Sequence, residues 1–516
     1  MYKPLSVIVL AFTLAAAPLF AQEGHEMKAK NDSSESEIPK PVLVSTQHSI
    51  TIDGKLIRYT ATTGTMLLRN HEDKPIALFG YTAYTKDGVT DPSTRPVTFA
   101  YNGGPGSSSM WLHMGALGPK KIVLNDPHAT PPAPYQLEDN TNSILDVTDL
   151  VIIDAIGTGF SRPVGKAKGS EFWGIDEDAK AVSGFIFQYL GEYNRWNSPK
   201  FLFGESYGTT RNAAVSDYLY EQDGIQLNGI IFLSTVWNFE TLAFAPGNDL
   251  PYILYMPTYA AVAWYHNALP SKPADLKSFL DQVRKFASGE YADALFKGQS
   301  IDSTEYNDVL EKLYEYTGIS KSYWAKADLR LSEPQFTAEL LRDRGEAVGR
   351  LDARFTGPEE DMIGEYSRYD PQSVKISPPF ITGFMDYLHN DLKFPTKYYY
   401  RVDAYGTKGF KWDWNQEGRR SFGFRDPNVA PNLADLMAKD PYMKVLMLNG
   451  YFDLATPFFA TEYTVDHLGN NIPDLLKRVE FKYYEAGHMV YVKPDIMPQL
   501  HKDVADFIES MIHPAK

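Results

Sequence analysis

Residues 201–222, FLFGESYGTTRNAAVSDYLYEQ, carry the strongest structural signal in the chain. The first three residues form an apolar run typical of a buried strand, and the residues from Thr209 onward have the pattern of a helix. Between them, Gly204 to Gly208 fits the pattern G-x-S-x-G, in which small residues on either side allow a serine to occupy a tight turn. This segment predicts a strand, a sharp turn that exposes Ser206, and a helix.

Apolar runs of the same kind recur on both sides of this segment. Each run ends at a glycine or a polar turn, and the runs are VTFAYNGG (97–104), LVIIDAIG (150–157), GIIFLST (229–235), KVLMLNG (444–450) and VEFKYYEAG (479–487). Runs that are apolar on both faces are typical of parallel strands. Helical patterns at 174–192 and 497–512 alternate with them. The alternation predicts an α/β fold with a mostly parallel central sheet and helices on both faces.

The patterns also predict where the chain divides. Residues 41–95 alternate apolar and polar side chains, with turn signals at Asp53-Gly54 and Asp87-Gly88 that indicate antiparallel hairpins. From 238 to 425, strand-like runs are few and helical ones are frequent, among them 276–287, 306–318 and 334–351. We therefore expect a core in two parts, residues 41–237 and 426–516, with a mostly helical cap inserted at 238–425.

The first 21 residues, MYKPLSVIVLAFTLAAAPLFA, have the pattern of a secretory signal peptide. Lys3 gives a positive start, an apolar run follows, and small residues precede a cleavage point after Ala21. The run is short for a transmembrane span, so we expect no stable span and a secreted or periplasmic protein. Residues 22–40 are polar and without periodicity, which predicts a flexible linker.

Composition limits the chemistry. The chain has 516 residues, and its 50 basic and 65 acidic side chains give a net charge of −15, so a nucleic-acid partner is not expected. There is no cysteine, which excludes disulfides, thiolate metal sites and cysteine nucleophiles. The remaining motifs call for neither a metal nor another cofactor, and we predict none.

Three residues in the order serine, aspartate, histidine follow predicted strands. A serine nucleophile needs a base, and the base needs an orienting carboxylate. Asp453 follows the strand at 444–450 and His488 follows the strand at 479–487, so both are expected at the same sheet edge as Ser206. His113, His389 and His467 are better explained as packing or surface residues. The order matches that of α/β-hydrolases.

A glycine-rich loop provides the remaining part of such a site. Two backbone N–H groups must stabilise the oxyanion that forms during acyl transfer. One is expected from Tyr207, directly after the nucleophile, and the other from the loop NGGPGSSS at 102–109. No Gly-Lys-Ser/Thr follows this loop, so a phosphate-binding role is disfavoured.

With these motifs in place, the chain resembles the serine carboxypeptidase family. The resemblance rests on NGGPGSSS (102–109), LGP (117–119), DAIGTGFS (154–161), GESYG (204–208), Asp453 in its turn and AGHMV (486–490). It implies an α/β-hydrolase fold and a serine-type carboxypeptidase that acts on peptides with a free C-terminus. It also implies site roles: Ser206, Asp453 and His488 are catalytic, the amides of Gly104 and Tyr207 form the oxyanion hole, and Asn102, Gly103, Glu205 and Met489 bind substrate.

The sequence departs from the family at three positions. The resemblance implies a second glutamate at the position of Ala116, a cysteine at Ser107 and a proline at Tyr491. Without the second glutamate, we expect a smaller rise in the pKa of Glu205 and less pronounced activity in acid.

The absence of this glutamate keeps an alternative open, an esterase or acyltransferase that uses the same fold and triad. A third alternative is a binding protein that has lost catalysis. It is disfavoured because all three triad residues are present.

Overall fold

The computed structural model describes residues 38–395, 398–416, 427–469 and 471–512, all within one compact unit that spans Ile38–Lys516. The expected signal peptide at 1–21 lies outside these residues, as does most of the expected linker at 22–40. In the described part of the chain, no helix is both long enough and apolar enough to cross a bilayer.

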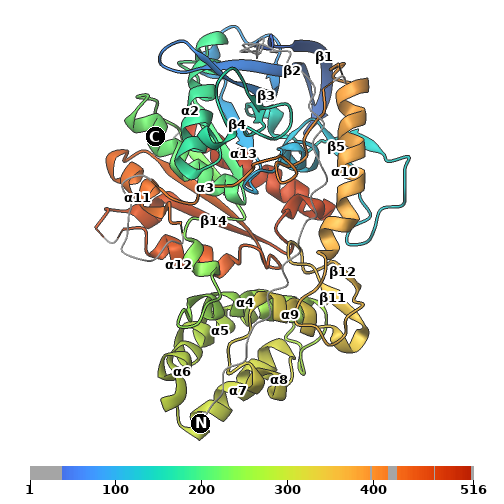
Figure 1. Ribbon diagram of the computed structural model, residues 1–516, viewed down its shortest axis with the longest axis vertical. Helices are drawn as coiled ribbons and strands as arrows, with labels where there is room; N and C mark the ends of the chain where they lie inside the picture. Colours follow the sequence, from blue (N-terminus) through green and yellow to red (C-terminus); the bar gives the residue numbers. More distant parts are fainter. Residues whose placement is uncertain (1–37, 396–397, 417–426, 470, 513–516) are drawn as a thin grey trace, which may run out of the picture. The chain divides into compact units, whose positions relative to one another are not determined.

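A ten-stranded sheet organises the fold (Figure 1). The strand order is β1-β2-β3-β7-β4-β9-β10-β13-β14, and β8 pairs with β3 beside this path. The six strands from β7 to β14 in this order run parallel to one another, and β7 pairs antiparallel with β3. The strands are β1 (Leu43–Ile52), β2 (Lys55–Arg69), β3 (Pro75–Lys86), β4 (Val97–Tyr101), β7 (Asp149–Ile153), β8 (Arg162–Pro163), β9 (Lys200–Glu205), β10 (Gly229–Leu233), β13 (Lys444–Gly450) and β14 (Val479–Tyr484).

Strands β1 to β3 form the antiparallel part of the sheet. Asp53-Gly54 joins β1 to β2, as the sequence predicts. The second turn is not at Asp87-Gly88, which follows the end of β3. It lies at 70–74, where the side chain of Asn70 accepts hydrogen bonds from the amides of Glu72 and Lys74 and so closes the turn. An Asn side chain that substitutes for a backbone acceptor leaves a weaker sequence signal than Asp-Gly.

Helices cover both faces of the sheet, and successive residues of a strand point alternately into two different cores. Leu202, Ile230 and Met447 face the core that includes α2 (Ile175–Glu192), α3 (Tyr207–Glu221) and α11 (Ala430–Lys439). Their neighbours Phe203, Ile231 and Leu448 face the core that includes α10 (Pro371–Asn390) and α13 (Met497–Ile512). The predicted α/β architecture is confirmed. Strands buried on both sides explain the continuous apolar runs in the sequence.

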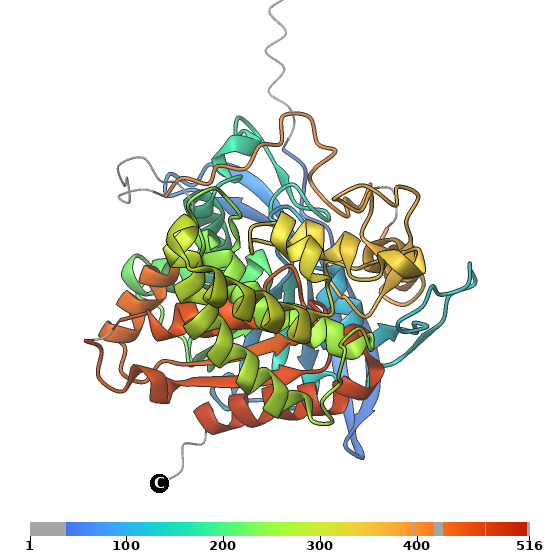
Figure 2. The same ribbon diagram turned by 90° about the horizontal axis from the view of Figure 1, so that it is seen from below.

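A third core lies among helices between β10 and β13. These helices group together in Figure 1, and the turned view in Figure 2 shows them in front of the strands. They are α4 (Leu250–Tyr265), α5 (Leu276–Phe286), α6 (Ala292–Lys297), α7 (Ser303–Thr317), α8 (Lys321–Lys326) and α9 (Glu333–Glu339). The helix expected over 334–351 is wrong beyond Glu339: a 3-10 turn at Arg342–Arg344 follows, and Gly345, with φ 76°, leads from it into the short strand β11 (Glu346–Val348).

Candidate active site

Ser206 occupies the sharp turn between β9 and α3. Its backbone has φ 60° and ψ −129°, a conformation that side-chain-bearing residues rarely adopt and that is concentrated at functional sites. A Cβ atom on Gly204 would lie 2.1 Å from the carbonyl oxygen of Gly208, so the turn cannot form with a larger residue there. The backbone N–H of Ser206 donates to the carbonyl of Leu233 at 3.0 Å, which ties the turn to the end of β10.

Asp453 and His488 form a buried pair in the loops that follow β13 and β14. The Nδ1 atom of His488 lies 2.8 Å from Oδ2 of Asp453. The other oxygen, Oδ1, accepts the amides of Ala455 at 2.8 Å and Thr456 at 3.0 Å, and the Thr456 hydroxyl donates to Oδ2 at 2.7 Å. These bonds fix the carboxylate, so the imidazole is held with Nδ1 toward Asp453.

The end of β10 brings the serine turn and the histidine loop together. Leu233 accepts the amide of Ser206, and the hydroxyl of the next residue, Ser234, donates to the carbonyl of His488 at 2.6 Å. Across the described residues, no hydrogen bond joins the Ser206 hydroxyl to His488. Such bonds are often long before substrate binds.

The pKa of His488 lies above its usual value. Burial lowers it, but the charge of Asp453, the hydrogen bond to Asp453 and the charge of Glu205 together outweigh burial. A base with a raised pKa accepts a proton readily and stays neutral only when the pH is high enough. The imidazole is thus prepared to take the proton of a nearby hydroxyl.

The glycine loop after β4 packs directly on the serine turn. A Cβ atom on Gly103 would lie 2.4 Å from the amide nitrogen of Tyr207 and 2.8 Å from the carbonyl of Glu205. Only a glycine permits this approach. The contact brings the loop that carries Gly104 against the turn that carries Tyr207, although the two segments follow different strands.

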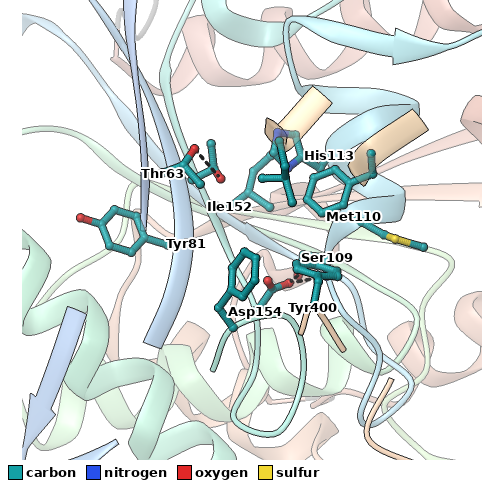
Figure 3. A pocket seen from close by; sticks show the side chains of 12 residues that line it. Thr63, Tyr81, Ser109, Met110, His113, Ile152, Asp154 and Tyr400 are labelled. Carbon is teal, nitrogen blue, oxygen red and sulfur yellow. Dashed lines mark hydrogen bonds between the residues drawn. The ribbon is translucent and has the colours of Figure 1, made fainter. Parts of the chain in front are cut away.

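A small internal pocket lies behind this loop (Figure 3). Asp154 accepts the amide of Ser109 at 2.8 Å and the hydroxyl of Tyr400 at 3.2 Å, and burial raises its pKa to about 6. The Ser109 hydroxyl in turn accepts the amide of Asn102 at 3.1 Å. Ser206, Asp453 and His488 do not line this pocket, and the hydrogen bonds of Ser109 and Asp154 hold the glycine loop in place. His113 also lines it, buried, with its pKa lowered to about 3 by burial.

Asn102 and Glu205 meet beside the serine. The Oδ1 atom of Asn102 accepts the amide of Leu112 at 2.9 Å, which turns the NH2 group toward Glu205. The Glu205 carboxyl is buried, and burial raises its pKa to about 7 against the lowering effects of His488, Tyr491 and Asn102. A carboxyl group with this pKa is neutral in mildly acidic solution and can then donate a hydrogen bond.

Sequence reasoning missed two contributors to the site. The Tyr491 hydroxyl donates to Oε2 of Glu205 at 2.8 Å, whereas the sequence marked Tyr491 only as a departure. The segment between α9 and α10 contributes Leu351, whose carbonyl accepts the amide of His488 at 2.7 Å. No local pattern signals either contact. Met489 and Ala116 are both buried, and the carbonyl of Ala116 accepts Nδ2 of Asn140 at 2.7 Å.

A strained serine at a strand–helix turn, on a largely parallel sheet with helices on both faces, defines an α/β-hydrolase. The family model of the serine carboxypeptidases matches residues 59–324, which is more than half of the chain. The chain belongs to the serine carboxypeptidase family, and the enzyme is a hydrolase.

Solved structures share the fold. The chain is similar to the crystal structure of Kex1(delta)p, a prohormone-processing carboxypeptidase from Saccharomyces cerevisiae, with 17% identity, coverage of 88% of this chain and 91% of that chain, and a TM-score of 0.52. Weaker similarity is found to proline iminopeptidase from Mycobacterium smegmatis, with 13% identity, 91% and 100% coverage and a TM-score of 0.35. No curated protein sequence matches the chain.

Proposed function

We propose that the enzyme releases single residues from the C-termini of peptides through an acyl-enzyme formed on Ser206. The observation that carries this proposal is the buried Asn102–Glu205 pair beside the serine turn. An amide donor and a neutral carboxyl group next to a nucleophile suit a substrate whose scissile bond lies one residue from a carboxylate. An esterase needs no such pair.

The chemistry follows from the groups at the sheet edge. His488 takes the proton of the Ser206 hydroxyl as the oxygen attacks the carbonyl carbon, and Asp453 stabilises the imidazolium that forms. The amides of Gly104 and Tyr207 donate to the oxyanion. His488 then gives its proton to the leaving amine, and water hydrolyses the acyl-enzyme by the same steps.

The substrate's terminal carboxylate is held by Asn102 and by neutral Glu205, with Gly103 and Met489 lining the site. Two oxygens that bear a negative charge need donors, and an ionised Glu205 would repel them. Recognition therefore depends on the protonated form of Glu205, which the pKa of about 7 makes available in mildly acidic solution.

We further propose that the chain is exported, with residues 1–21 as its signal, and acts in a secreted or periplasmic location. The linker at 22–40, the core at 41–237 and 426–516, and the helical cap at 238–425 remain part of this proposal. Helices α4 to α9, which share their own core, support the cap assignment.

A three-substrate comparison tests the proposed function. The purified enzyme is incubated with a blocked dipeptide with a free C-terminus, the same dipeptide amidated, and its methyl ester, and labelling by a fluorophosphonate is measured. We expect turnover of the free acid and weak turnover of the amide. Ser206→Ala should lose the labelling, and its activity should fall by about 10⁴-fold or more. Turnover of the ester alone, with Ser206 labelled, would favour the esterase or acyltransferase instead.

A further inference from the structure

Tyr491, Asn102 and Glu205 form a cluster of buried side chains from three separate segments: the 3-10 turn at 490–492, the loop after β4 and the end of β9. The Tyr491 hydroxyl donates to Oε2 of Glu205 at 2.8 Å, and the Asn102 side chain acts on both groups, since it lowers the pKa of each. The exposed fractions are 4% for Tyr491, 3% for Glu205 and 4% for Asn102, so water does not compete for these interactions. The proposed mechanism uses two of the three residues and leaves Tyr491 without a role.

The position of the Tyr491 ring is fixed by packing. A Cβ atom on Gly115 would lie 2.3 Å and 2.4 Å from two ring carbons, so the ring occupies the space that a side chain at 115 would need. Phe380 on α10 closes the same space, with its ring 3.2 Å from that Cβ position. Because interiors are close-packed, a ring held this way places its hydroxyl at one point. The hydroxyl is thus aimed at Glu205 by the packing of Gly115.

A hydrogen bond to one oxygen of a carboxyl group affects both of its oxygens. The carbonyl oxygen of a neutral carboxyl is a better acceptor than its hydroxyl oxygen. With Tyr491 donating to Oε2, the proton of neutral Glu205 is favoured on Oε1, from which it is free to donate elsewhere. When Glu205 is ionised, the same bond stabilises the carboxylate. The charged groups that face Glu205 besides these partners are His488, whose charge lowers its pKa, and Asp453, whose charge raises it.

We propose that Tyr491 is a positioning residue of this site: its hydroxyl holds the Glu205 carboxyl against Asn102 and thereby sets how strongly the enzyme prefers a free C-terminal carboxylate. This inference rests on the proposed carboxypeptidase function. It adds a specificity-determining side chain, and it makes the phenol of Tyr491 the hydrogen-bond partner of Glu205.

Tyr491→Phe tests the role, because it removes the hydroxyl and keeps the ring. For the free-acid dipeptide in mildly acidic solution, KM should rise about tenfold, the effect of one lost hydrogen bond to a buried group, with kcat changed less. For the matching ester, KM and kcat should stay at their wild-type values. Activity on the free acid declines at high pH, and this decline, the upper limb of the pH profile, should move to higher pH. The reason is that the bond that stabilises the Glu205 carboxylate is lost.

Tyr484→Phe is the matched control. The Tyr484 hydroxyl donates to Asp503 at 2.8 Å, so this variant also removes a buried phenol–carboxylate bond of the same length. It should leave the ratio of free-acid to ester turnover and the upper limb unchanged. Gly115→Ala is a second test, since it displaces the ring without removing the hydroxyl, and it should raise the free-acid KM in the same direction.

The outcomes separate the two proposals. If the wild-type enzyme turns over no free-acid peptide, the carboxypeptidase function fails, whatever Tyr491 does. If the wild-type enzyme prefers free acids, but Tyr491→Phe changes neither the free-acid KM nor the upper limb, the role of Tyr491 is overturned. The same holds if Tyr491→Phe weakens ester and free-acid turnover equally, because a merely structural role would produce that result.

Discussion

Glu205 shows how one buried side chain acquires its chemistry from its surroundings. The sequence predicts a smaller rise of its pKa because Ala116 offers no second carboxyl group. In the structure, burial is the largest cause of a pKa raised to about 7, the charge of Asp453 raises it further, and Tyr491, rather than a residue at 116, donates to the carboxyl. The protonation state of Glu205 is therefore set by the lack of water around it, which no neighbouring residue in the sequence reveals.

The pH dependence of substrate preference follows from this pKa. Glu205 donates only while it is protonated, so recognition of a free carboxylate should be complete well below pH 7 and decline as the pH rises through about 7. The measurement is kcat/KM for the free-acid dipeptide divided by kcat/KM for its ester, since this ratio cancels the titration of His488. It should fall about tenfold for each pH unit above the pKa.

Glu205→Gln should flatten this ratio between about pH 5 and about pH 9, because the amide donates in a neutral form at every pH. Glu333→Gln is the control, since burial also raises the pKa of Glu333 to about 7. The control should keep the wild-type slope. A Glu205→Gln enzyme that keeps the slope would contradict the assignment of Glu205.

At the scale of elements, the site depends on how closely the loop after β4 approaches the turn after β9. The two strands are neighbours in parallel register, with Tyr101 opposite Gly204, so their carboxyl ends lie at one edge of the sheet. Parallel register brings the loops together, and glycine at 103 allows contact. The sequence indicated both loops but not how tightly they pack.

Gly103→Ala tests this approach. The new methyl group would lie 2.4 Å from the Tyr207 nitrogen, so the loop must withdraw and the two proposed oxyanion donors must separate. We expect kcat for both ester and free-acid substrates to fall by about 10² to 10³, the effect of losing one oxyanion donor. Gly289→Ala is the matched control, because no heavy atom lies within 4 Å of its Cβ position, and activity should be unchanged. Wild-type kcat in the Gly103→Ala enzyme would refute the tight packing.

At the scale of the whole described chain, a segment between the cap helices and α10 completes the site. The carbonyl of Leu351 accepts the amide of His488, and the carbonyl of Arg350 accepts the amide of Leu454 at 3.1 Å. Arg354 holds this segment through two bonds of 2.9 Å to Asp126 and one of 2.6 Å to Asp352. The loops of Asp453 and His488 are thus tied to a segment a hundred or more residues away in the sequence.

Arg354→Met should destabilise the protein and disturb catalysis together. The side-chain exposed fractions of Arg354 and Asp352 are 2% and 0%, so removing the guanidinium leaves buried carboxylates without a counter-charge. The cost is about 3 to 5 kcal/mol in the free energy of unfolding, measured by urea denaturation. Arg368→Ala, which removes an exposed pair with Glu360, should change the free energy of unfolding by less than about 1 kcal/mol. Equal effects of the two substitutions would contradict the role of the buried pair.

The sequence by itself determined the α/β class, the strand that precedes Ser206 and the helices at 175–192 and 497–512, because these depend on local periodicity and on turn residues. It also gave the order of the proposed triad, since each residue follows its own strand. It placed the turn between β2 and β3 wrongly, because the side chain of Asn70 closes that turn, and it extended the helix over 334–351 beyond Glu339.

Only the tertiary structure decided which distant groups surround these residues. Tyr491 and Glu205 are 286 positions apart, and nothing near either residue in the sequence indicates their hydrogen bond. The same is true of Leu351 and His488. Their contacts arise because β14 joins the sheet next to β13, and because close packing leaves one place for the Tyr491 ring. The sequence specifies which chemical groups are present and in what order, whereas burial and the resulting pKa of Glu205 exist only in the folded chain.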